Sequence, residues 1–367
     1  MFSQFEMRRS LLELLIPWLV LVCFGAVMVG SAAVALQGDY LAKHLVFVLL
    51  GAVAFVFMFA LPHALLKRFY LVGWLIALAI SVAVLIPGVG HEANGASRWL
   101  RVAGISIQAA EVAKFGLMIY LAGYLSRYRD ELAAAPQRVI VPIFMIGMIA
   151  LLLLAEPDFG STAVILGAAF GVIFIAGIRL RYVALILLVI TVLLALLIWL
   201  EPYRMRRLVS FADPWAVPYD DGYQLVQALI GFGRGEIFGL GLGESIQKLY
   251  YLPEAHNDFI FAVIAEELGV VGTLTVVLIF SYLVLQMLRT ARLCLQQDHL
   301  FAGYLCYFGA LVFGLQLLVN LGVNTGVLPT KGLTLPFISY GGSSLVVSCA
   351  MFGLIASCVR KLGATHD

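Results

Sequence analysis

Ten apolar segments, each close to twenty residues long, constrain this chain more than any other feature of its sequence. A helix that spans a bilayer needs about 20 mostly apolar residues, because main-chain polar groups find no water in the hydrocarbon. Of the 367 residues, 63% are hydrophobic and 12% are charged, and the mean hydropathy is +1.03. A soluble core cannot bury this composition. The predicted spans cover residues 15–36, 44–62, 69–87, 107–125, 139–155, 160–178, 182–200, 268–288, 300–321 and 338–359.

The sequence therefore predicts an all-α integral membrane protein that forms one polytopic domain over residues 1–367. Its fold is expected to be a bundle of about ten transmembrane helices with one large extracytoplasmic loop, residues 201–259. The first apolar run is too long for the core of a signal peptide, so we interpret it as a retained span.

Lysine and arginine predict the orientation of the bundle in its membrane, because short basic loops stay in the cytoplasm. We expect both termini to be cytoplasmic and the long loop to lie on the outer side of the membrane. The net charge of +2 is then a topology signal and does not indicate nucleic-acid binding. The thirteen basic residues of the inner segments are Arg8, Arg9, Lys67, Arg68, Arg127, Arg129, Arg138, Arg179, Arg181, Arg289, Arg292, Arg360 and Lys361, and the four of the short outer segments are Lys43, Arg98, Arg101 and Lys331.

The long loop re-enters the membrane through residues 252–261, LPEAHNDFIF, which hold Glu254, His256 and Asp258. Two acids and a histidine at a membrane–water boundary suit chemistry on a lipid-borne substrate. His256 is expected to orient Asp258 or to bind phosphate, with a packing or hydrogen-bonding role as the alternative. The loop of residues 201–259 is longer than about 12–15 residues, and loops of that length are usually functional or disordered.

Charges inside or beside the predicted spans mark further candidates. Glu111 and Lys114 are three residues apart, so on a helix they share a face and can pair. Intramembrane charges are costly and usually line a cavity, although a structural ion pair is the alternative. Arg98 and Arg101 flank Trp99, and arginine recognises phosphate through a planar fork of donors. The alternative is an interfacial tryptophan anchor with snorkelling arginines.

Two segments rich in glycine interrupt the helical pattern. Residues 231–243 contain Arg234, and residues 324–344 contain Lys331, Ser339 and Tyr340. In residues 324–344, irregular backbone at membrane depth persists only where it is buried in protein or lines a cavity. We therefore expect Lys331, Ser339 and Tyr340 to contact substrate, with a helix break for packing alone as the alternative. Residues 231–243 belong to the long external loop, where Arg234 is expected to contact substrate.

Four motifs together resemble those of the SEDS family, the shape, elongation, division and sporulation proteins. They are NGASRW at residues 94–99, the pair Glu111 and Lys114, LPEAHNDFIF followed by AEELG, and LPTKGLTLPFISYGGSS at residues 328–344. The resemblance covers nearly the whole chain and is closer to the division branch than to the elongation branch. The chain departs from the family pattern in having Ala109 and Ala110, where Pro-Ser often precedes the glutamate.

This resemblance implies a ten-helix inner-membrane peptidoglycan glycosyltransferase that polymerises lipid II. It also implies a class B penicillin-binding transpeptidase as a partner, together with other membrane proteins of the division machinery. Carried over by motif, the essential acid of the family falls on Asp258 and the intramembrane pair falls on Glu111 and Lys114.

Glycan polymerisation needs a base for the acceptor hydroxyl and cations for the departing pyrophosphate. Asp258 is the predicted catalytic base. Arg98, Arg101, Lys114, Arg234 and Lys331 supply candidate cations, and a divalent cation, Mg or Mn, can do part of that work although no ligand spacing requires one. The predicted substrate-binding residues are Arg98, Glu111, Lys114, Arg234, Glu254, His256, Lys331, Ser339 and Tyr340.

Two other functional classes remain as alternatives. A flippase for the lipid-linked precursor should carry polar residues through the full membrane depth, whereas the clear intramembrane charges here cluster toward the outside. A non-catalytic division scaffold would have no need of Asp258.

Overall fold

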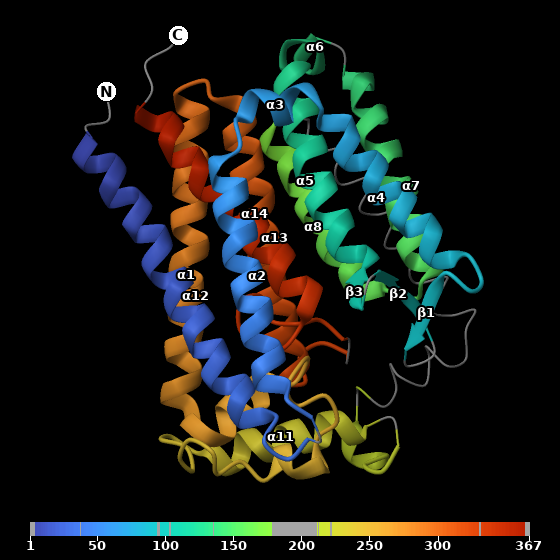
Figure 1. Ribbon diagram of the computed structural model, residues 1–367, viewed down its shortest axis with the longest axis vertical. Coiled ribbons are helices and arrows are strands. Elements are labelled where there is room, and N and C mark those ends of the chain that lie inside the picture. The colour runs from blue at the N-terminus through green and yellow to red at the C-terminus, as the bar shows by residue number, and fades with distance from the viewer. Residues whose placement is uncertain are drawn as a thin grey trace.

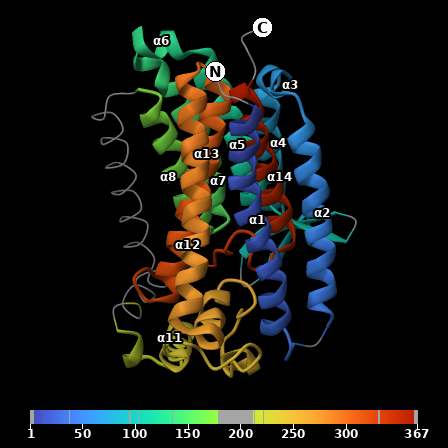
Figure 2. The same ribbon diagram turned by 90° about the vertical axis from the view of Figure 1, so that its left-hand side faces the viewer.

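The computed structural model describes residues 4–36, 38–93, 96–102, 104–134, 136–177, 211, 213–220, 222–329 and 332–363. Figures 1 and 2 show a bundle of helices that run roughly parallel to its long axis. The α-helices are α1 (Gln4–Ala32), α2 (Tyr40–Ala60), α3 (His63–Arg68), α4 (Tyr70–Leu85), α5 (Ala109–Arg127), α6 (Arg129–Ala134), α7 (Ile140–Ala155), α8 (Phe159–Ile175), α11 (Tyr223–Gly235), α12 (Ile260–Gln296), α13 (Leu300–Asn324) and α14 (Gly342–Cys358).

Nine of the ten predicted spans coincide with a helix of the bundle, and the tenth, residues 182–200, lies outside the described residues. The boundaries differ most at α12, which covers 37 residues and is kinked at Gly269, next to the predicted start of the span at residue 268. Six of the described helices are long and apolar enough to cross a membrane. Helices α4 and α8, with 16 and 17 residues, are apolar but shorter.

A small antiparallel sheet stands between α4 and α5, where the sequence predicted only a loop. Its strands are β1 (Gly90–Ala93), β2 (Ala96–Val102) and β3 (Ile105–Gln108), in the order β1-β2-β3. The pairing of β2 with β3 sets Trp99 opposite Gln108 and Val102 opposite Ile105. Helix α5 begins directly after β3, so the sheet fixes where Arg98 stands relative to the first turn of α5.

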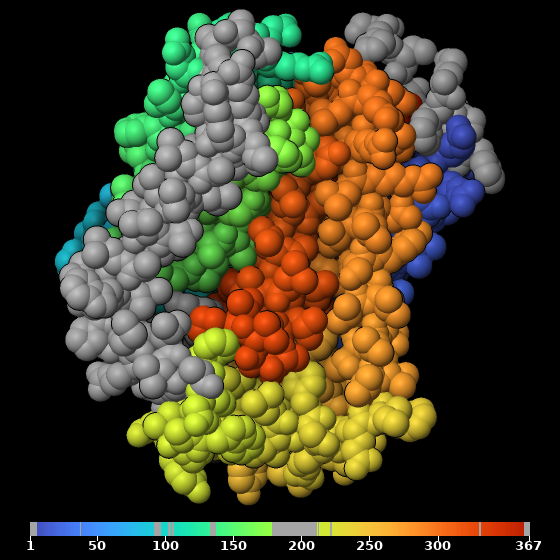
Figure 3. Space-filling view, turned by 180° about the vertical axis from the view of Figure 1, so that it is seen from behind, coloured from blue at the N-terminus to red at the C-terminus, as the bar shows by residue number. Residues whose placement is uncertain are grey.

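The two ends of the bundle differ in structure. Figure 1 shows the start of α1 and the end of α14 at one end, together with α3 and α6, and α11 lying across the opposite end. In Figure 3 the yellow residues, which belong to the long loop, form a layer over that end, below α12 and α13. The helices pack closely: a Cβ atom added to Gly116 on α5 would lie 2.4 Å from the carbonyl oxygen of Gly73 on α4. Small residues at such crossings let helix backbones approach.

A buried network of charges fastens the long loop to the bundle. The Lys248 Nζ atom lies 2.7 Å from Glu267 Oε1 on α12, and the two side chains are 2% and 0% exposed. Ser31 at the end of α1 donates a hydrogen bond to the Glu267 carboxylate. The neighbouring Glu266 accepts hydrogen bonds from Ser245 Oγ and from the main-chain N–H of Gln247. This network joins α1, the loop and α12, and it explains the two consecutive glutamates of the AEELG motif.

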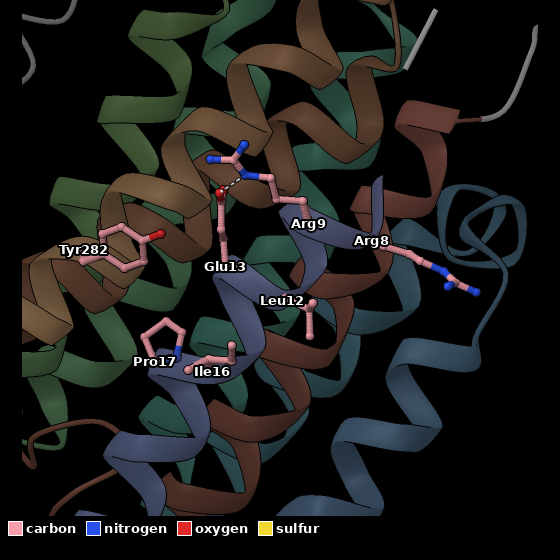
Figure 4. A pocket seen from close by; sticks show the side chains of 7 residues that line it. All are labelled: Arg8, Arg9, Leu12, Glu13, Ile16, Pro17 and Tyr282. Carbon is pink, nitrogen blue, oxygen red and sulfur yellow. Dashed lines mark hydrogen bonds and ion pairs between the residues drawn. The ribbon is translucent and has the colours of Figure 1, made fainter. Parts of the chain in front are cut away.

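At the other end, α1 and α12 border a groove. Figure 4 shows its lining side chains, with the Arg9 guanidinium directed at Glu13. The Arg9 Nε atom lies 2.9 Å from Glu13 Oε1. Because α1 starts at the end of the bundle opposite the long loop, this groove is far from residues 252–259 and is not the candidate site. The lining residues are Arg8, Arg9, Leu12, Glu13, Ile16, Pro17 and Tyr282.

The Lys248–Glu267 pair gives a test of the fold. Replacing Lys248 with Met leaves the Glu267 carboxylate buried without its counter-ion, which should lower the free energy of unfolding by about 3–5 kcal/mol. The double variant, Lys248→Met with Glu267→Met, should recover most of the loss, because it leaves no buried charge unpaired. Thermal unfolding of the detergent-purified variants measures both effects. A single variant as stable as the parent would show that the pair does not fasten the loop.

Candidate active site

Asp258 is held in place by its own main chain. Its carbonyl oxygen accepts hydrogen bonds from the side-chain amides of Asn320 and Asn324 on α13, each at 3.0 Å. The Asn324 Oδ1 atom in turn accepts from the main-chain N–H of Ala262, in the first turn of α12, at 3.2 Å. The same N–H also donates to the carbonyl oxygen of Phe259 at 3.0 Å. Asn324 thus adds a side-chain acceptor at the start of α12 and anchors Asp258 through the same side chain.

The irregular segment of residues 332–341 binds the loop of Asp258 from the other side. The Ser339 hydroxyl donates to the carbonyl oxygen of Asn257 at 2.7 Å. The main-chain N–H of Tyr340 donates to the carbonyl oxygen of His256 at 3.0 Å. Asn320 also donates to the carbonyl oxygen of Leu333 at 2.7 Å. Two segments without regular structure thus satisfy each other's main-chain polar groups within the bundle, as an apolar environment requires.

The residues around Asp258 are acidic. The pKa of the Asp258 carboxyl is raised to about 7, first by burial and then by the negative charges of Glu254 and Asp158, against the opposing charge of Arg98. Asp258 as a residue is partly exposed. A carboxyl that titrates near neutral pH at a partly exposed position has the properties of a general base.

Arg98 and Asp158 join this site from distant parts of the sequence. Arg98 on β2 donates from Nε to the carbonyl oxygen of Glu156 at 3.0 Å and from Nη2 to that of Pro157 at 2.7 Å. Asp158 caps α8 through Ser161 N–H at 3.1 Å and accepts a hydrogen bond from Gln108 Nε2 at 3.3 Å.

Close contacts connect this turn to Asp258. A Cβ atom on Gly160 of α8 would lie 3.0 Å from the Leu333 side chain, and one on Gly332 would lie 2.7 Å from Asp258 Oδ2. The turn between α7 and α8 therefore borders the same site as Asp258, with residues 332 and 333 between them.

Glu111 and Lys114 form a buried pair in the first two turns of α5. Lys114 Nζ lies 2.7 Å from Glu111 Oε1, and their side chains are 1% and 4% exposed. The prediction that they share a helix face and pair is confirmed. Lys114 already has a carboxylate partner, while Glu111 Oε2 has no hydrogen-bond partner among the described residues.

His256 and Tyr340 form an aromatic cluster with Tyr40 beside the loop of Asp258. The ring centroids of His256 and Tyr340 are 5.5 Å apart, and the Tyr40 ring lies 5.1 Å from His256. The pKa of His256 is lowered by burial, with the Glu254 charge opposing the shift. A neutral imidazole packed between phenols is better suited to contact a sugar or to hold the loop than to pair with phosphate.

The remaining predicted residues are placed as follows. Glu254 accepts a hydrogen bond from Asn257 Nδ2 at 2.5 Å, within the Asp258 loop. Ser339 holds the loop by its hydrogen bond to Asn257. Arg234 on α11 pairs with the fully buried Glu266 at 3.4 Å, which ties it to the network under the long loop. Lys331 lies outside the described residues.

Sequence reasoning missed four residues of the site. Asn320 and Asn324 are four apart on an otherwise apolar helix, a spacing that places two amides on one face. Glu156 and Asp158 stand between two predicted spans, where an acid before a helix is an N-cap signal. Both signals were present in the sequence, but neither indicates which distant segment the side chains bind.

Among the described residues, no cluster of three His, Cys, Asp or Glu side chains is arranged to hold a metal ion.

Comparison with known proteins gives the family. The family model of FtsW, RodA and SpoVE, described as "Cell cycle protein", matches residues 12–363. The chain therefore belongs to this family, the SEDS family that the four motifs predicted. A curated relative from Hahella chejuensis, named "Probable peptidoglycan glycosyltransferase FtsW", is 46% identical over 94% of this chain and 88% of its own length. A similar relative of the same name from Methylococcus capsulatus is also 46% identical, over 91% of this chain and 86% of its own.

Solved structures agree with the fold. A chain from a structure described as "Structural coordination of polymerization and crosslinking by a peptidoglycan synthase complex" superposes with a TM-score of 0.81. It is 29% identical, and the match covers 96% of this chain and 98% of that one. Relatives named FtsW agree with the predicted resemblance to the division branch.

Gly332 allows the position of the Asp258 carboxylate to be tested without removing it. A methyl group at Gly332 would lie 2.7 Å from Asp258 Oδ2, so Gly332→Ala should displace the carboxylate and leave the bundle intact. Displacements of about 1 Å can cost about a hundredfold in rate. We expect glycan polymerisation to fall by about tenfold to a hundredfold, with an unchanged melting temperature.

Gly233→Ala on α11 is the matched control, because a methyl group there meets nothing within 4 Å. It should keep the parental rate. Full activity of Gly332→Ala would mean that the carboxylate has no fixed working position.

Proposed function

We propose that this protein is a peptidoglycan glycosyltransferase that polymerises lipid II into glycan strands, for septal synthesis during cell division. The observation that carries the proposal is Asp258, a partly exposed residue with a carboxyl pKa of about 7 on a loop fixed by α13 and by residues 332–341. The names of the curated relatives and the sequence motifs support the same activity.

In this mechanism Asp258 takes the proton of the acceptor sugar hydroxyl, and the oxygen of that hydroxyl bonds to the anomeric carbon of the donor. The bond from the anomeric carbon to the lipid pyrophosphate breaks, and the lipid pyrophosphate leaves. The base must be deprotonated, so turnover should rise as the pH passes through about 7. Arg98 stands in the same site with part of its guanidinium free of main-chain partners, and we assign it to the pyrophosphate. Lys331 and Lys114 are further candidate cations, and Glu254, His256 and Tyr340 would line the substrate site.

A divalent cation, Mg or Mn, would bind together with the pyrophosphate, because the described residues provide no three-ligand cluster of their own. It would neutralise charge on the leaving group.

The protein is proposed to lie in the inner membrane with its termini in the cytoplasm, so that the layer over α11 and the Asp258 loop face the periplasm. Its thirteen inner basic residues support this orientation. A class B penicillin-binding transpeptidase is the proposed partner, with other division proteins. The solved complex that couples polymerization with crosslinking supports a partner of that kind.

Removing the ionisable group of Asp258 tests the function. Asp258→Asn keeps the shape of the side chain, and polymerisation of purified lipid II should fall by about 10²–10⁴-fold, the range for a positioned proton-transfer group. Asp220→Asn, an exposed acid in the same loop, is the control and should keep the parental rate. Headgroup translocation without polymer by the parent protein would indicate a flippase. A parent protein that neither polymerises nor translocates lipid II would be a scaffold. A fully active Asp258→Asn would show that Asp258 is not the base.

A further inference from the structure

The turn between α7 and α8 contains a buried carboxyl with no role in the mechanism above. The Glu156 side chain is 1% exposed, and neither of its carboxylate oxygens has a hydrogen-bond partner among the described residues. A buried carboxylate without partners is costly, whereas the protonated acid is less so. Hydrogen bonds from Arg98 and to Asp158 already hold this turn, so an apolar side chain would fill the position without this cost.

Arg98 binds the backbone of this same turn. Its Nε and Nη2 atoms donate to the carbonyl oxygens of Glu156 and Pro157. Within the parts of the chain that the structure describes, no carboxylate lies within ion-pairing distance of Arg98, although Glu156 is the residue whose carbonyl it binds. The guanidinium is thus positioned by main-chain oxygens, and its charge is left for another anion.

The charged groups that act on Glu156 come from two elements. Asp158 belongs to the same turn, and Arg98 comes from β2. Burial raises the pKa of Glu156 to about 8, with a further rise from Asp158 and an opposing effect from Arg98. The charges of Arg98 and Asp158 also act on Asp258, so the two carboxyls share the same charged neighbours.

We propose that Glu156 is a positioning residue whose neutral acid form leaves the Arg98 guanidinium free to bind the substrate pyrophosphate. Its carboxylate form attracts the same guanidinium, which already binds the carbonyl oxygen of Glu156. The inference rests on the proposed function, because it names the group that controls pyrophosphate binding at that site.

The two carboxyls then give activity opposite dependences on pH. Asp258 works as a carboxylate, so activity increases as the pH rises through about 7. Glu156 works as the neutral acid, so substrate binding weakens as the pH rises through about 8. The result is a bell-shaped profile whose acid side appears in kcat and whose alkaline side appears in KM.

Glu156→Gln tests this, because the amide keeps the shape and neutrality of the acid and cannot ionise. Lipid II polymerisation is measured from about pH 6 to about pH 9.5. At neutral pH the variant should retain activity within about twofold of the parent. Above pH 8 the KM of the parent should rise by roughly tenfold per pH unit, and that of the variant should stay constant. Glu244→Gln, an exposed glutamate of the long loop, should behave as the parent does.

Binding of undecaprenyl pyrophosphate separates this proposal from the proposed function. It should weaken above pH 8 in the parent and not in Glu156→Gln, whether or not the protein makes polymer. A parental KM and affinity that do not change with pH would overturn the proposal without any variant. So would a folded Glu156→Gln that keeps the alkaline loss of binding, or one that is inactive at every pH.

Discussion

Two irregular segments inside an apolar bundle must satisfy each other's main-chain polar groups, and the candidate site depends on this constraint. Where residues 252–259 and 332–341 enter the bundle, their main-chain groups bind Ser339, Asn320 and Asn324 and each other's N–H and C=O groups. Every one of these bonds fixes main chain next to Asp258. The position of the carboxylate is therefore a result of backbone hydrogen bonding at the end of α13.

Electrostatics at the site follow from an excess of acids over one nearby arginine. The charges of Arg98 and Asp158 act on both Glu156 and Asp258, and the charge of Glu254 acts on Asp258. Burial raises the pKa of the Glu156 carboxyl and of the Asp258 carboxyl. A site with this balance is suited to take up a proton and, through Arg98 and added cations, to hold a pyrophosphate. The structural roles in the protein fall to other charges, since Lys248, Glu266 and Glu267 fasten the long loop away from the reacting groups.

The intramembrane ion pair and the acidic site lie on neighbouring structural elements. The first two turns of α5 hold the buried Glu111–Lys114 pair, in which Glu111 Oε1 binds Lys114 Nζ. The helix follows the strand that ends at Gln108, whose side chain binds Asp158. The sheet thus links the intramembrane pair to the acidic site through main chain. Because Arg98 sits on the same sheet, a displacement of β2 would move the cation and the helix start together.

The sequence by itself determined the helices and the family. Runs of about 20 apolar residues have one stable form in a bilayer, so α1, α2, α13 and α14 followed from composition, and the motif around Asp258 was specific enough to indicate the acid. It could not determine the sheet of β1–β3, whose short strands carry little periodic signal. Nor could it place Arg234 beside Glu266, or Glu156 beside Arg98. Those pairings join residues tens of positions apart, and only the packing of the helices brings them within reach of each other.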